Sequence, residues 1–375
     1  MQIKAGIISF NTDASREGRK RKKMIQTEQE KIPESPEYLR MSLAAAMTLG
    51  LKPGRFYRNA KLYCINLLLT YGAGCAAKCA YCGLSNKREG QYNEKSFIRV
   101  TWPTHSLSQI IERISERPHK VKRICISQIT NKRSVQDTKD ICSRLRSSFD
   151  IPVSLLISPT ILSKEDLLDF KDAGADKIGV AIDLATPELF DQYRGKGVGG
   201  PHKWETYQQC LSDAITIFGK RNAGSHFVTG MGETEKEMVE AIQKIQDSGG
   251  WTHLFSFFPE ADSQMKDHPI PAMDHYRRIQ LARYLMDEGF SHSEKMAFDP
   301  SGRILDFGLP PKELNRIIDT GEPFRTSGCQ GYDGQVACNR PYANSRPGPD
   351  MRNYPFPPNG EDIHRIRDQM GMAIS

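Results

Sequence analysis

The sequence has no long hydrophobic run. Although 38% of its 375 residues are hydrophobic, no stretch approaches the roughly 20 apolar residues that a membrane-spanning helix requires. The first ten residues, MQIKAGIISF, also lack the basic region and the cleavage pattern of a secretory signal peptide. We therefore expect no membrane partner, and we expect a cytoplasmic location.

The sequence also lacks the setting in which cysteines pair as disulfides. It contains nine cysteines, an odd number, and the missing secretion signal predicts a reducing compartment. Clustered cysteines in such a chain indicate metal or redox chemistry.

Concentrated charge is scarce except in one place. The net charge is +7, and the densest basic run covers residues 19–23. Such a run is usually a solvated tail or helix face, and no aromatic residues interleave with it as binding of single-stranded nucleic acid would require. We therefore do not expect a nucleic-acid partner. The alternative left open is a non-catalytic iron–sulfur or zinc module that recognises nucleic acid through this run.

The chain divides into three parts by composition. Residues 1–60 form a polar N-terminal extension, in which residues 36–49 are predicted to be helical. Residues 61–299 alternate short apolar runs with amphipathic stretches. Residues 300–375 are rich in Pro, Gly, Asn and Arg, which predicts an irregular segment, closed by a helix from about Gly360.

The middle part predicts a parallel sheet. Strands separated by helices at this interval form βαβ units, whose strands run parallel. About six units are too few for a closed eight-fold barrel. The predicted fold class is therefore α/β, a partial, three-quarter barrel with its chemistry at the C-terminal ends of the strands. The predicted strands cover residues 62–70, 123–127, 153–157, 177–182, 226–229 and 253–258, and the predicted helices cover 107–117, 164–173, 204–218, 235–247 and 273–288.

Three cysteines lie directly after the first predicted strand. Cys75, Cys79 and Cys82 have the spacing C-x3-C-x2-C. Three thiolates on one tight loop hold three irons of a [4Fe–4S] cluster and leave the fourth iron without a protein ligand. S-adenosylmethionine (SAM) can chelate that iron, and its reductive cleavage gives a 5′-deoxyadenosyl radical. A structural zinc site or a ferredoxin cluster needs four ligands, and no fourth cysteine or histidine lies nearby.

The motif and the alternation of strands and helices resemble the radical SAM superfamily over about residues 61–289. Two segments inside this region resemble biotin synthase and lipoyl synthase. They are residues 181–190, AIDLATPELF, and residues 228–234, VTGMGET. The resemblance implies a [4Fe–4S] cluster and SAM as cofactors.

The resemblance also implies contacts to SAM. Tyr81 would lie near the adenine, Asp183 would bond the ribose hydroxyls, and the guanidinium of Arg194 would pair with the carboxylate of SAM. Asp183 has an alternative interpretation as a helix cap, because it precedes the Thr-Pro-Glu start of a helix.

Two further pairs of SAM contacts follow from the same resemblance. Ser127 and Gln128, at the end of the second predicted strand, would accept from the amino group of SAM. Gly230 and Gly232 would let the backbone approach the adenine, as glycines do where a ligand needs close contact. A turn residue is the alternative for each.

Two more cysteines lie in a glycine-rich part of the C-terminal segment. Cys329 and Cys338 stand in a stretch too polar to bury itself, so metal binding would supply the free energy that orders it. We predict that they ligate an auxiliary iron–sulfur cluster, and the alternative is two unrelated thiols. The third ligand is open between Ser327, Ser345 and a distant cysteine. The remaining cysteines, Cys64, Cys125, Cys142 and Cys210, are interpreted as small buried core residues.

The positions of the cysteines that could hold an auxiliary cluster distinguish this chain from two known enzymes. Biotin synthase holds its sacrificial cluster with cysteines on several barrel strands, of which this chain has only Cys125. One-component lipoyl synthase uses an N-terminal triplet of cysteines, and no cysteine precedes Cys64 here. The tail, with Cys329 and then CNRPYAN from Cys338, resembles one subunit of the two-component lipoyl synthase of archaea and some bacteria.

This resemblance implies insertion of sulfur into an octanoyl chain at C6 or C8, with the auxiliary cluster as the sulfur source. The implied partners are an octanoylated lipoyl carrier protein or peptide, a second radical SAM subunit, and an electron donor such as ferredoxin or flavodoxin. The alternative is another radical SAM reaction of cofactor biosynthesis, whether biotin synthase-like sulfur insertion, rearrangement or C–C cleavage.

Overall fold

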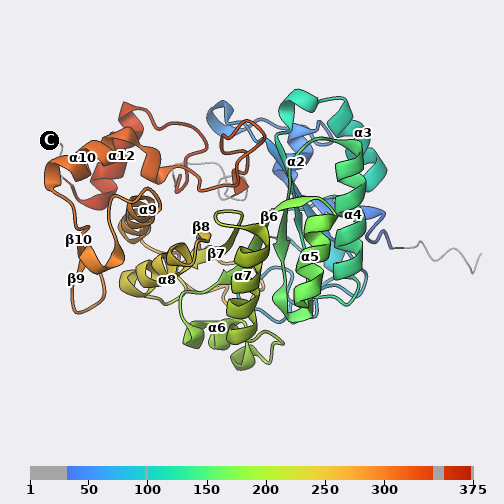
Figure 1. Ribbon diagram of the computed structural model, residues 1–375, viewed down its shortest axis with the longest axis horizontal. Helices are drawn as coiled ribbons and strands as arrows, with labels where there is room; N and C mark the ends of the chain where they lie inside the picture. Colours follow the sequence, from blue (N-terminus) through green and yellow to red (C-terminus); the bar gives the residue numbers. More distant parts are fainter. Residues whose placement is uncertain (1–31, 98–99, 341–349, 373–375) are drawn as a thin grey trace, which may run out of the picture.

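A computed structural model describes residues 32–97, 100–340 and 350–372 (Figure 1). The strands of its main sheet are β1 (Tyr38–Met41), β2 (Cys64–Leu69), β3 (Thr104–Ser106), β4 (Arg123–Ser127), β5 (Val153–Ile157), β6 (Ala175–Asp183), β7 (Ala223–Thr229) and β8 (Trp251–Ser256). Their order in the sheet is β3-β1-β2-β4-β5-β6-β7-β8. From β2 to β8 every neighbouring pair is parallel, whereas β1 is antiparallel to both β2 and β3. The fold is therefore α/β with a mostly parallel sheet.

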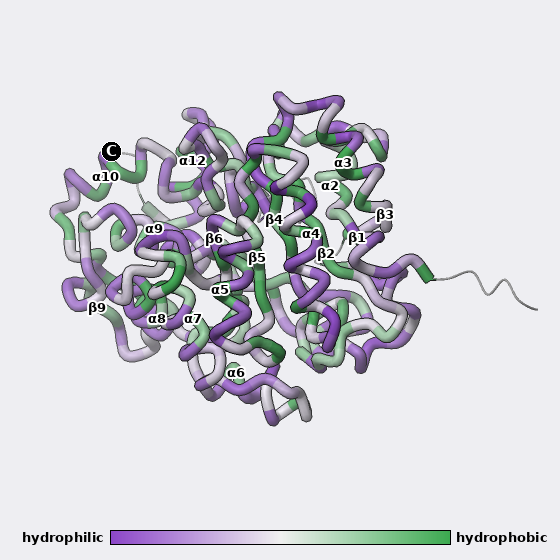
Figure 2. The backbone as a smooth tube through the Cα atoms, turned by 45° about the vertical axis from the view of Figure 1, so that its right-hand side comes forward, coloured by the Kyte–Doolittle hydropathy of each residue, from purple (hydrophilic) through white to green (hydrophobic). Residues whose placement is uncertain are grey.

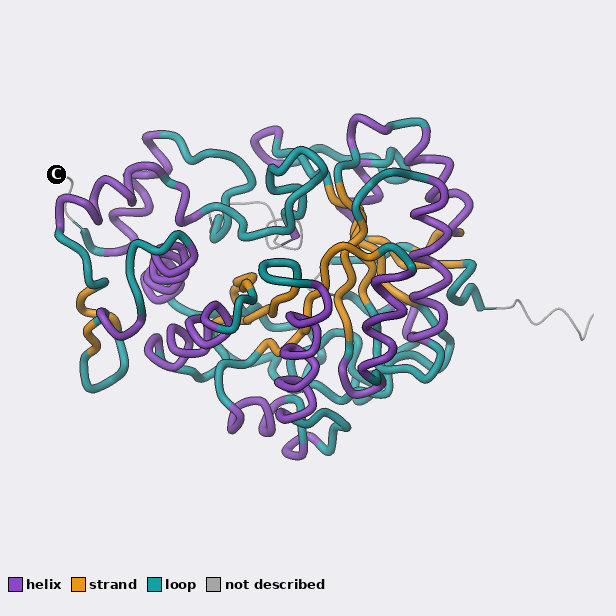
Figure 3. Tube along the Cα trace, in the orientation of Figure 1, coloured by secondary structure: helices purple, strands orange, loops and turns teal. Residues whose placement is uncertain are grey.

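Helices lie around the outside of this sheet, and those of the last part of the chain lie to one side of it (Figures 1 and 3). They are α2 (Leu43–Thr48), α3 (Leu107–Ser115), α4 (Ser134–Ser148), α5 (Lys164–Asp172), α6 (Pro187–Tyr193), α7 (Trp204–Phe218), α8 (Glu235–Asp247), α9 (Met273–Asp287), α10 (Pro311–Thr320) and α12 (Gly360–Met370). Short 3₁₀ helices cover Tyr57–Asn59, Tyr92–Glu94, Pro118–Lys120, Pro159–Ile161, Lys196–Val198, Ser293–Lys295 and Glu322–Phe324. Among the described residues, no helix has both the length and the apolar content to span a membrane.

Local signals explain where several helices begin. Ser163 precedes α5, and its side chain accepts from the backbone N–H of Asp166, whose carboxylate accepts in return. Thr234 and Glu237 form the same reciprocal arrangement at the start of α8. Each cap contributes about 1 kcal/mol, because it satisfies donors that the first turn leaves unpaired.

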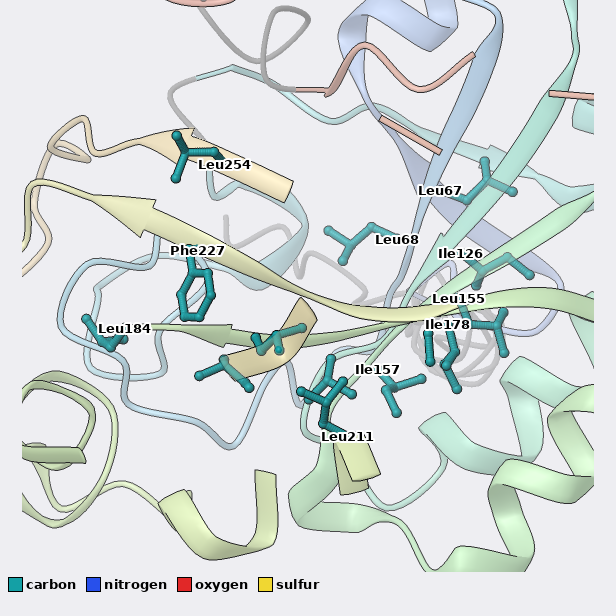
Figure 4. Close-up of a cluster of buried hydrophobic side chains, with 14 of the residues drawn as sticks. Leu67, Leu68, Ile126, Leu155, Ile157, Ile178, Leu184, Leu211, Phe227 and Leu254 are labelled. Atoms are coloured by element: carbon teal, nitrogen blue, oxygen red, sulfur yellow. The ribbon is translucent and has the colours of Figure 1, made fainter. Parts of the chain in front are cut away.

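The core lies between the parallel strands and these helices. All six residues of β2 are buried, as expected for a parallel strand covered on both faces. Figure 2 shows the hydrophobic colour concentrated on β4 and β5, with more hydrophilic colour on α4 and α5 outside them. Leu67, Ile126 and Leu155, on neighbouring strands, belong to one cluster of buried side chains (Figure 4). Burying a side chain of this kind stabilises the fold by about 1.5–3 kcal/mol.

The predicted helix over residues 36–49 is wrong in its first half. The chain forms strand β1, and the side chain of Ser42 then accepts from a backbone N–H to cap the short helix α2. Tertiary contacts override helix propensity here. The buried guanidinium of Arg40 donates to the carbonyl oxygens of Tyr92 and Trp102, at 2.9 and 3.0 Å, which ties β1 to the connection between β2 and β3.

The segment after residue 300 is more regular than its composition predicts. It contains β10 (Ile304–Asp306), which pairs with β9 (Ala297–Phe298), and the helices α10 and α12. Arg367 of α12 pairs with Asp319 of α10 at 2.7 Å, and Arg58 pairs with the nearly buried Asp362 of α12 at 2.7 Å. The C-terminal segment is thereby joined to the rest of the chain. The basic run at residues 19–23 lies outside the described residues.

Candidate functional site

The C-x3-C-x2-C motif forms a loop directly after β2, at the C-terminal ends of the strands. Backbone hydrogen bonds tie this loop to other connections at the same end. Ala76 donates to the carbonyl of Thr130, which follows β4, and Ala80 donates to the carbonyl of Tyr193 at the end of α6, both at 2.8 Å. The loop is therefore held from two sides before any cofactor binds.

The three motif cysteines line one cavity. Cys79 is buried, and Cys75 and Cys82 are half-buried. Burial raises the pKa of the Cys79 thiol to about 12 and raises that of Cys82 well above its ordinary value, so bare thiolates are unfavourable here. An iron cluster fits this donor set, because bound metal deprotonates its thiol ligands.

Among the described residues, no three His, Cys, Asp or Glu side chains are arranged to hold a single metal ion.

Three of the predicted SAM contacts lie together at the wall of this cavity. The Tyr81 hydroxyl and Nη1 of Arg194 both donate to Oδ2 of Asp183, at 2.7 and 2.5 Å. Nη2 of Arg194 donates to the hydroxyl of Tyr207 at 3.1 Å, and that hydroxyl contacts His202 at 3.0 Å. Burial and the charge of Arg194 lower the pKa of His202 to about 2, so its imidazole is neutral. The arrangement is a buried ion pair inside a polar network.

Asp183 is not a helix cap. The side chain of Thr186 caps α6 by accepting from the N–H of Leu189 at 3.3 Å. Asp183 instead has a φ of +69°, at the end of β6. The alternative interpretation of this residue is therefore wrong, and its contact with the ribose stays a prediction.

Ser127 and Gln128 both line the cavity. Nε2 of Gln128 donates to Thr138 at 3.1 Å, and its Oε1 accepts from the N–H of Ser158 at 3.2 Å. The hydroxyl of Ser127 accepts from Nη1 of Arg340 at 3.1 Å. Both side chains are thus already engaged with protein groups, and their contact with the amino group of SAM stays a prediction.

Gly230 and Gly232 shape the turn after β7. Their φ values are +98° and +114°, which glycine adopts at little cost. A Cβ on Gly230 would lie 2.5 Å from a side-chain atom of Pro271. Neither glycine is among the residues that line the cavity. The backbone conformation at both positions, and the close packing of Gly230 on Pro271, therefore explain why glycine stands there. Their approach to the adenine stays a prediction.

The tail cysteines lie beside two cysteines of the main sheet. Cys329 and Cys338 pack against Cys64 of β2 and Cys125 of β4. The Nδ2 atom of Asn66 lies 3.5 Å from the Sγ of Cys64 and 3.8 Å from that of Cys338. Cys64 and Cys125 are buried, as their interpretation as core residues requires, but their neighbours are thiols rather than ordinary core side chains.

The other ligand candidates of the tail are less well placed. The hydroxyl of Ser327 accepts from the backbone N–H of Leu254 at 3.2 Å, and Ser345 lies outside the described residues. Cys142 is buried in the main core cluster, and Cys210 packs against that cluster. These last two cysteines are core residues as expected.

The tail cysteines line a second cavity that shares a wall with the first. Leu156, His226, Phe255 and Arg340 line both cavities. Arg340 is only 2% exposed. Burial and this guanidinium lower the pKa of His226 to about 3, so its imidazole is neutral.

Several lining residues were not predicted from the sequence. Phe257, Phe258 and Glu260 directly follow β8 and line the first cavity. Their place after a parallel strand is the signal that could have found them, because ligands bind at the carboxyl ends of such strands. The sequence around Arg340 gives no comparable indication, because Arg340 does not follow a strand and reaches the wall between the cavities only through the fold of the tail.

The model of the radical SAM superfamily matches residues 69–245 of the chain. This stretch begins at the end of β2 and includes the cysteine loop. The chain is therefore similar to the radical SAM superfamily over this stretch, which is slightly less than half of its length, and the similarity implies a [4Fe–4S] cluster and SAM as cofactors. The match describes the superfamily as a whole and does not choose among its reactions.

Several solved structures resemble the chain at low sequence identity and with TM-scores below 0.5. HydG, a maturase of the [FeFe]-hydrogenase, is 12% identical with a TM-score of 0.45, over 65% of this chain and 52% of HydG. HydG from Carboxydothermus hydrogenoformans is 12% identical with a TM-score of 0.46, over 88% and 70%. The methyltransferase TsrM from Kitasatospora setae is 12% identical with a TM-score of 0.40, over 76% and 57%. The chain thus spans about half the length of the first of these structures. No curated protein sequence matches it.

Proposed function

We propose that the chain is a sulfur-inserting radical SAM enzyme of the lipoyl synthase type, which acts on an octanoyl chain. The observation that carries the proposal is the common wall of the two cavities, formed by Leu156, His226, Phe255 and Arg340. A substrate carbon at this wall would lie between the radical-generating motif and the tail cysteines. Sulfur insertion requires that geometry, because the carbon must reach both reagents in turn.

The lining of the first cavity supports an acyl substrate. Leu68, Ile129, Val228 and Phe257 present apolar side chains to it. Each CH₂ group that leaves water for such a wall contributes about 0.8 kcal/mol to binding. The apolar wall also excludes water from the space where a reactive carbon radical would form.

When bound, the [4Fe–4S] cluster and SAM supply a 5′-deoxyadenosyl radical that abstracts hydrogen from an unactivated carbon. The chain contributes the ligands Cys75, Cys79 and Cys82 and the polar wall around Asp183 and Arg194. An auxiliary cluster held by Cys329 and Cys338 would supply the sulfide. For each sulfur inserted, the hydrogen atom of the substrate carbon would leave as part of 5′-deoxyadenosine, a carbon–sulfur bond would replace it, and one electron would reduce the iron of that cluster.

The position and charge of Arg340 favour the binding of a sulfide-bearing group in the second cavity. Its guanidinium lies over the rings of Phe97 and Trp102, 5.5 and 5.6 Å from their centroids, and donates to Ser127. A buried positive charge beside Cys338 favours the thiolate form of that ligand. Arg340 would therefore orient and neutralise a negatively charged cluster on its substrate side.

The partners of this reaction are part of the proposal. The substrate would be an octanoylated lipoyl carrier protein or peptide. A second radical SAM subunit would complete the two sulfur insertions, and ferredoxin or flavodoxin would deliver the electron that cleaves SAM. The tail sequence from Cys329 to the CNRPYAN segment supports this assignment by its resemblance to the two-component lipoyl synthase.

The double variant Cys329→Ala/Cys338→Ala tests the proposal. It should lose about half of its iron, because one of two four-iron clusters is lost. It should still form 5′-deoxyadenosine, since the first cysteine loop is untouched, but it should give no thiolated octanoyl product. Cys142→Ala/Cys210→Ala is the matched control, because it removes one buried and one partly buried cysteine elsewhere in the chain.

Two results would contradict the proposal. One is full iron content in the Cys329→Ala/Cys338→Ala variant together with thiolated product. The other is a parent enzyme that cleaves SAM and returns the octanoyl chain rearranged or cleaved, which would favour the alternative radical SAM reaction.

A further inference from the structure

Four cysteines from three separate parts of the chain meet in one buried cluster. Cys64 and Cys125 come from neighbouring parallel strands, and Cys329 and Cys338 come from the tail. In the register of β2 and β4, Asn66 is the partner of Cys125. Because side chains alternate along a strand, Cys64, Asn66 and Cys125 point to the same face of the sheet. That face is the inner one, since Cys125 lines the second cavity.

A hairpin brings the two tail cysteines together although eight residues separate them. The N–H groups of Ala337 and Cys338 donate to the carbonyl of Cys329 at 3.0 and 3.1 Å, and Gln330 pairs with Val336. A Cβ on Gly328 would lie only 1.7 Å from the carbonyl oxygen of Cys338, so only glycine allows this approach.

The start of β4 anchors this hairpin against the sheet. The guanidinium of Arg123, which is 2% exposed, donates to the carbonyl of Gln330. Next to it, Lys122 pairs with Asp333 of the hairpin at 2.6 Å. The tail thiols are therefore held in place by contacts that do not involve the cysteines.

The polar groups around the cluster indicate a bound group. Nε2 of His253 lies 3.4 Å from the Sγ of Cys329. Within the described part of the chain, Oδ1 of Asn66, Nδ1 of His253 and Nε of Arg340 are buried and have no hydrogen-bond partner. Buried polar atoms are almost always paired, and three orphans around one group of thiols mark a place for a ligand.

We infer that Cys64, Cys125, Cys329 and Cys338 are the complete ligand set of a second four-iron cluster. This inference rests on the proposed function and supplies the two ligands that the tail lacks. Four thiolates are the usual ligand set of such a cluster. The hydroxyl of Ser327 is not needed as a ligand, in keeping with its hydrogen bond to the backbone of β8. Binding releases the thiol protons and involves no change in the oxidation state of the protein.

The test uses a parent variant that lacks the first cluster, Cys75→Ala/Cys79→Ala/Cys82→Ala. After anaerobic reconstitution with iron and sulfide and removal of excess reagent, this parent should retain about four irons per chain, with a Mössbauer spectrum of a thiolate-ligated cubane. Adding Cys64→Ala or Cys125→Ala should reduce the retained iron severalfold. Adding Cys142→Ala, which removes another buried cysteine, should leave it unchanged.

Circular dichroism separates a missing ligand from an unfolded chain. In Cys64→Ala and Cys125→Ala only a small side chain is shortened and no oxygen ligand is introduced, so their circular dichroism should equal that of the parent while their iron falls. Four irons retained after loss of Cys64 or Cys125, but not after loss of Cys329 and Cys338, would overturn the ligand set and leave the proposed function standing. A parent variant that binds no iron, or binds zinc instead, would overturn both.

Discussion

Asp183 has a backbone conformation that few side chains adopt. Its φ of +69° costs about 1–2 kcal/mol in a residue other than glycine. The hydroxyl of Tyr81 and the guanidinium of Arg194 hold its carboxylate, at 2.7 and 2.5 Å. Arg194 is 6% exposed, so little water is available to replace the carboxylate as the partner of its guanidinium.

Replacing Asp183 with Ala should lower the free energy of unfolding by about 3–5 kcal/mol, because it leaves Arg194 as an unpaired buried charge. The double variant Asp183→Ala/Arg194→Met removes both charges and should recover much of this loss. Urea unfolding of the apoprotein measures both changes. A single variant as stable as the parent would show that the pair does not hold the end of β6.

The role of a single residue could be predicted from the sequence where that role depends only on residues close to it in the chain. The spacing of the motif places three thiols on one loop without knowledge of the rest of the fold. The pairing of Asp183 with Arg194 depends on how α6 turns between them, which no local pattern records. Cys64 and Cys125 were interpreted as core residues because a buried ligand and a buried core residue give the same pattern in an apolar strand.

The turn after β7 is tied to α9 by buried charges. The carboxylate of Glu233 accepts from the N–H groups of Gly230 and Met231, at 2.6 and 2.9 Å. Nδ1 of His275 lies 3.2 Å from Glu235, and its Nε2 lies 4.0 Å from Glu233. Burial alone lowers the pKa of His275, but the two glutamates outweigh it and raise the pKa to about 9.

The stability of this connection should depend on pH. The pKa of His275 in the folded chain is about 9, above its ordinary value of 6.5, so its contribution is complete below about pH 6.5 and is lost as the pH rises through about 9. The free energy of unfolding should fall across this window by at most about 3 kcal/mol from this group. Urea titrations of the parent and of His275→Gln measure the fall, which should be flatter in the variant.

His292→Gln is the control for this comparison, because the side chain of His292 is 38% exposed and lies on the surface. It should keep the pH dependence of the parent. If His275→Gln also kept it unchanged, the buried charges would not be what ties the turn after β7 to α9.

Strands and helices whose own sequence pattern indicates their structure were predicted well. The predicted strands 123–127 and 153–157 coincide with β4 and β5, because a buried parallel strand is a short apolar run between polar segments. β1 was missed, since its backbone pairs with two partners that its own sequence does not specify. The tail hairpin was missed for the same reason, because it is ordered by contacts with β4.

In the whole molecule, the tail hairpin (residues 329–338) lies at the end of the sheet opposite the C-x3-C-x2-C loop. Arg123, which contacts Gln330, opens β4, whereas the cysteine loop follows the C-terminal end of β2. The two cavities therefore lie one behind the other along the strands and meet at Arg340. No sequence pattern predicts this arrangement, since the contacting residues are more than 200 positions apart.

A single anaerobic turnover with an octanoylated lipoyl carrier peptide most directly tests the central claim that one chain holds both a radical generator and a sulfur donor. The chain is reconstituted with iron and isotopically labelled sulfide, then mixed with SAM, dithionite and the peptide, and the products are measured by mass spectrometry. The account predicts 5′-deoxyadenosine together with a peptide that has gained the mass of one labelled sulfur atom. Formation of 5′-deoxyadenosine with a peptide that never gains sulfur would contradict it.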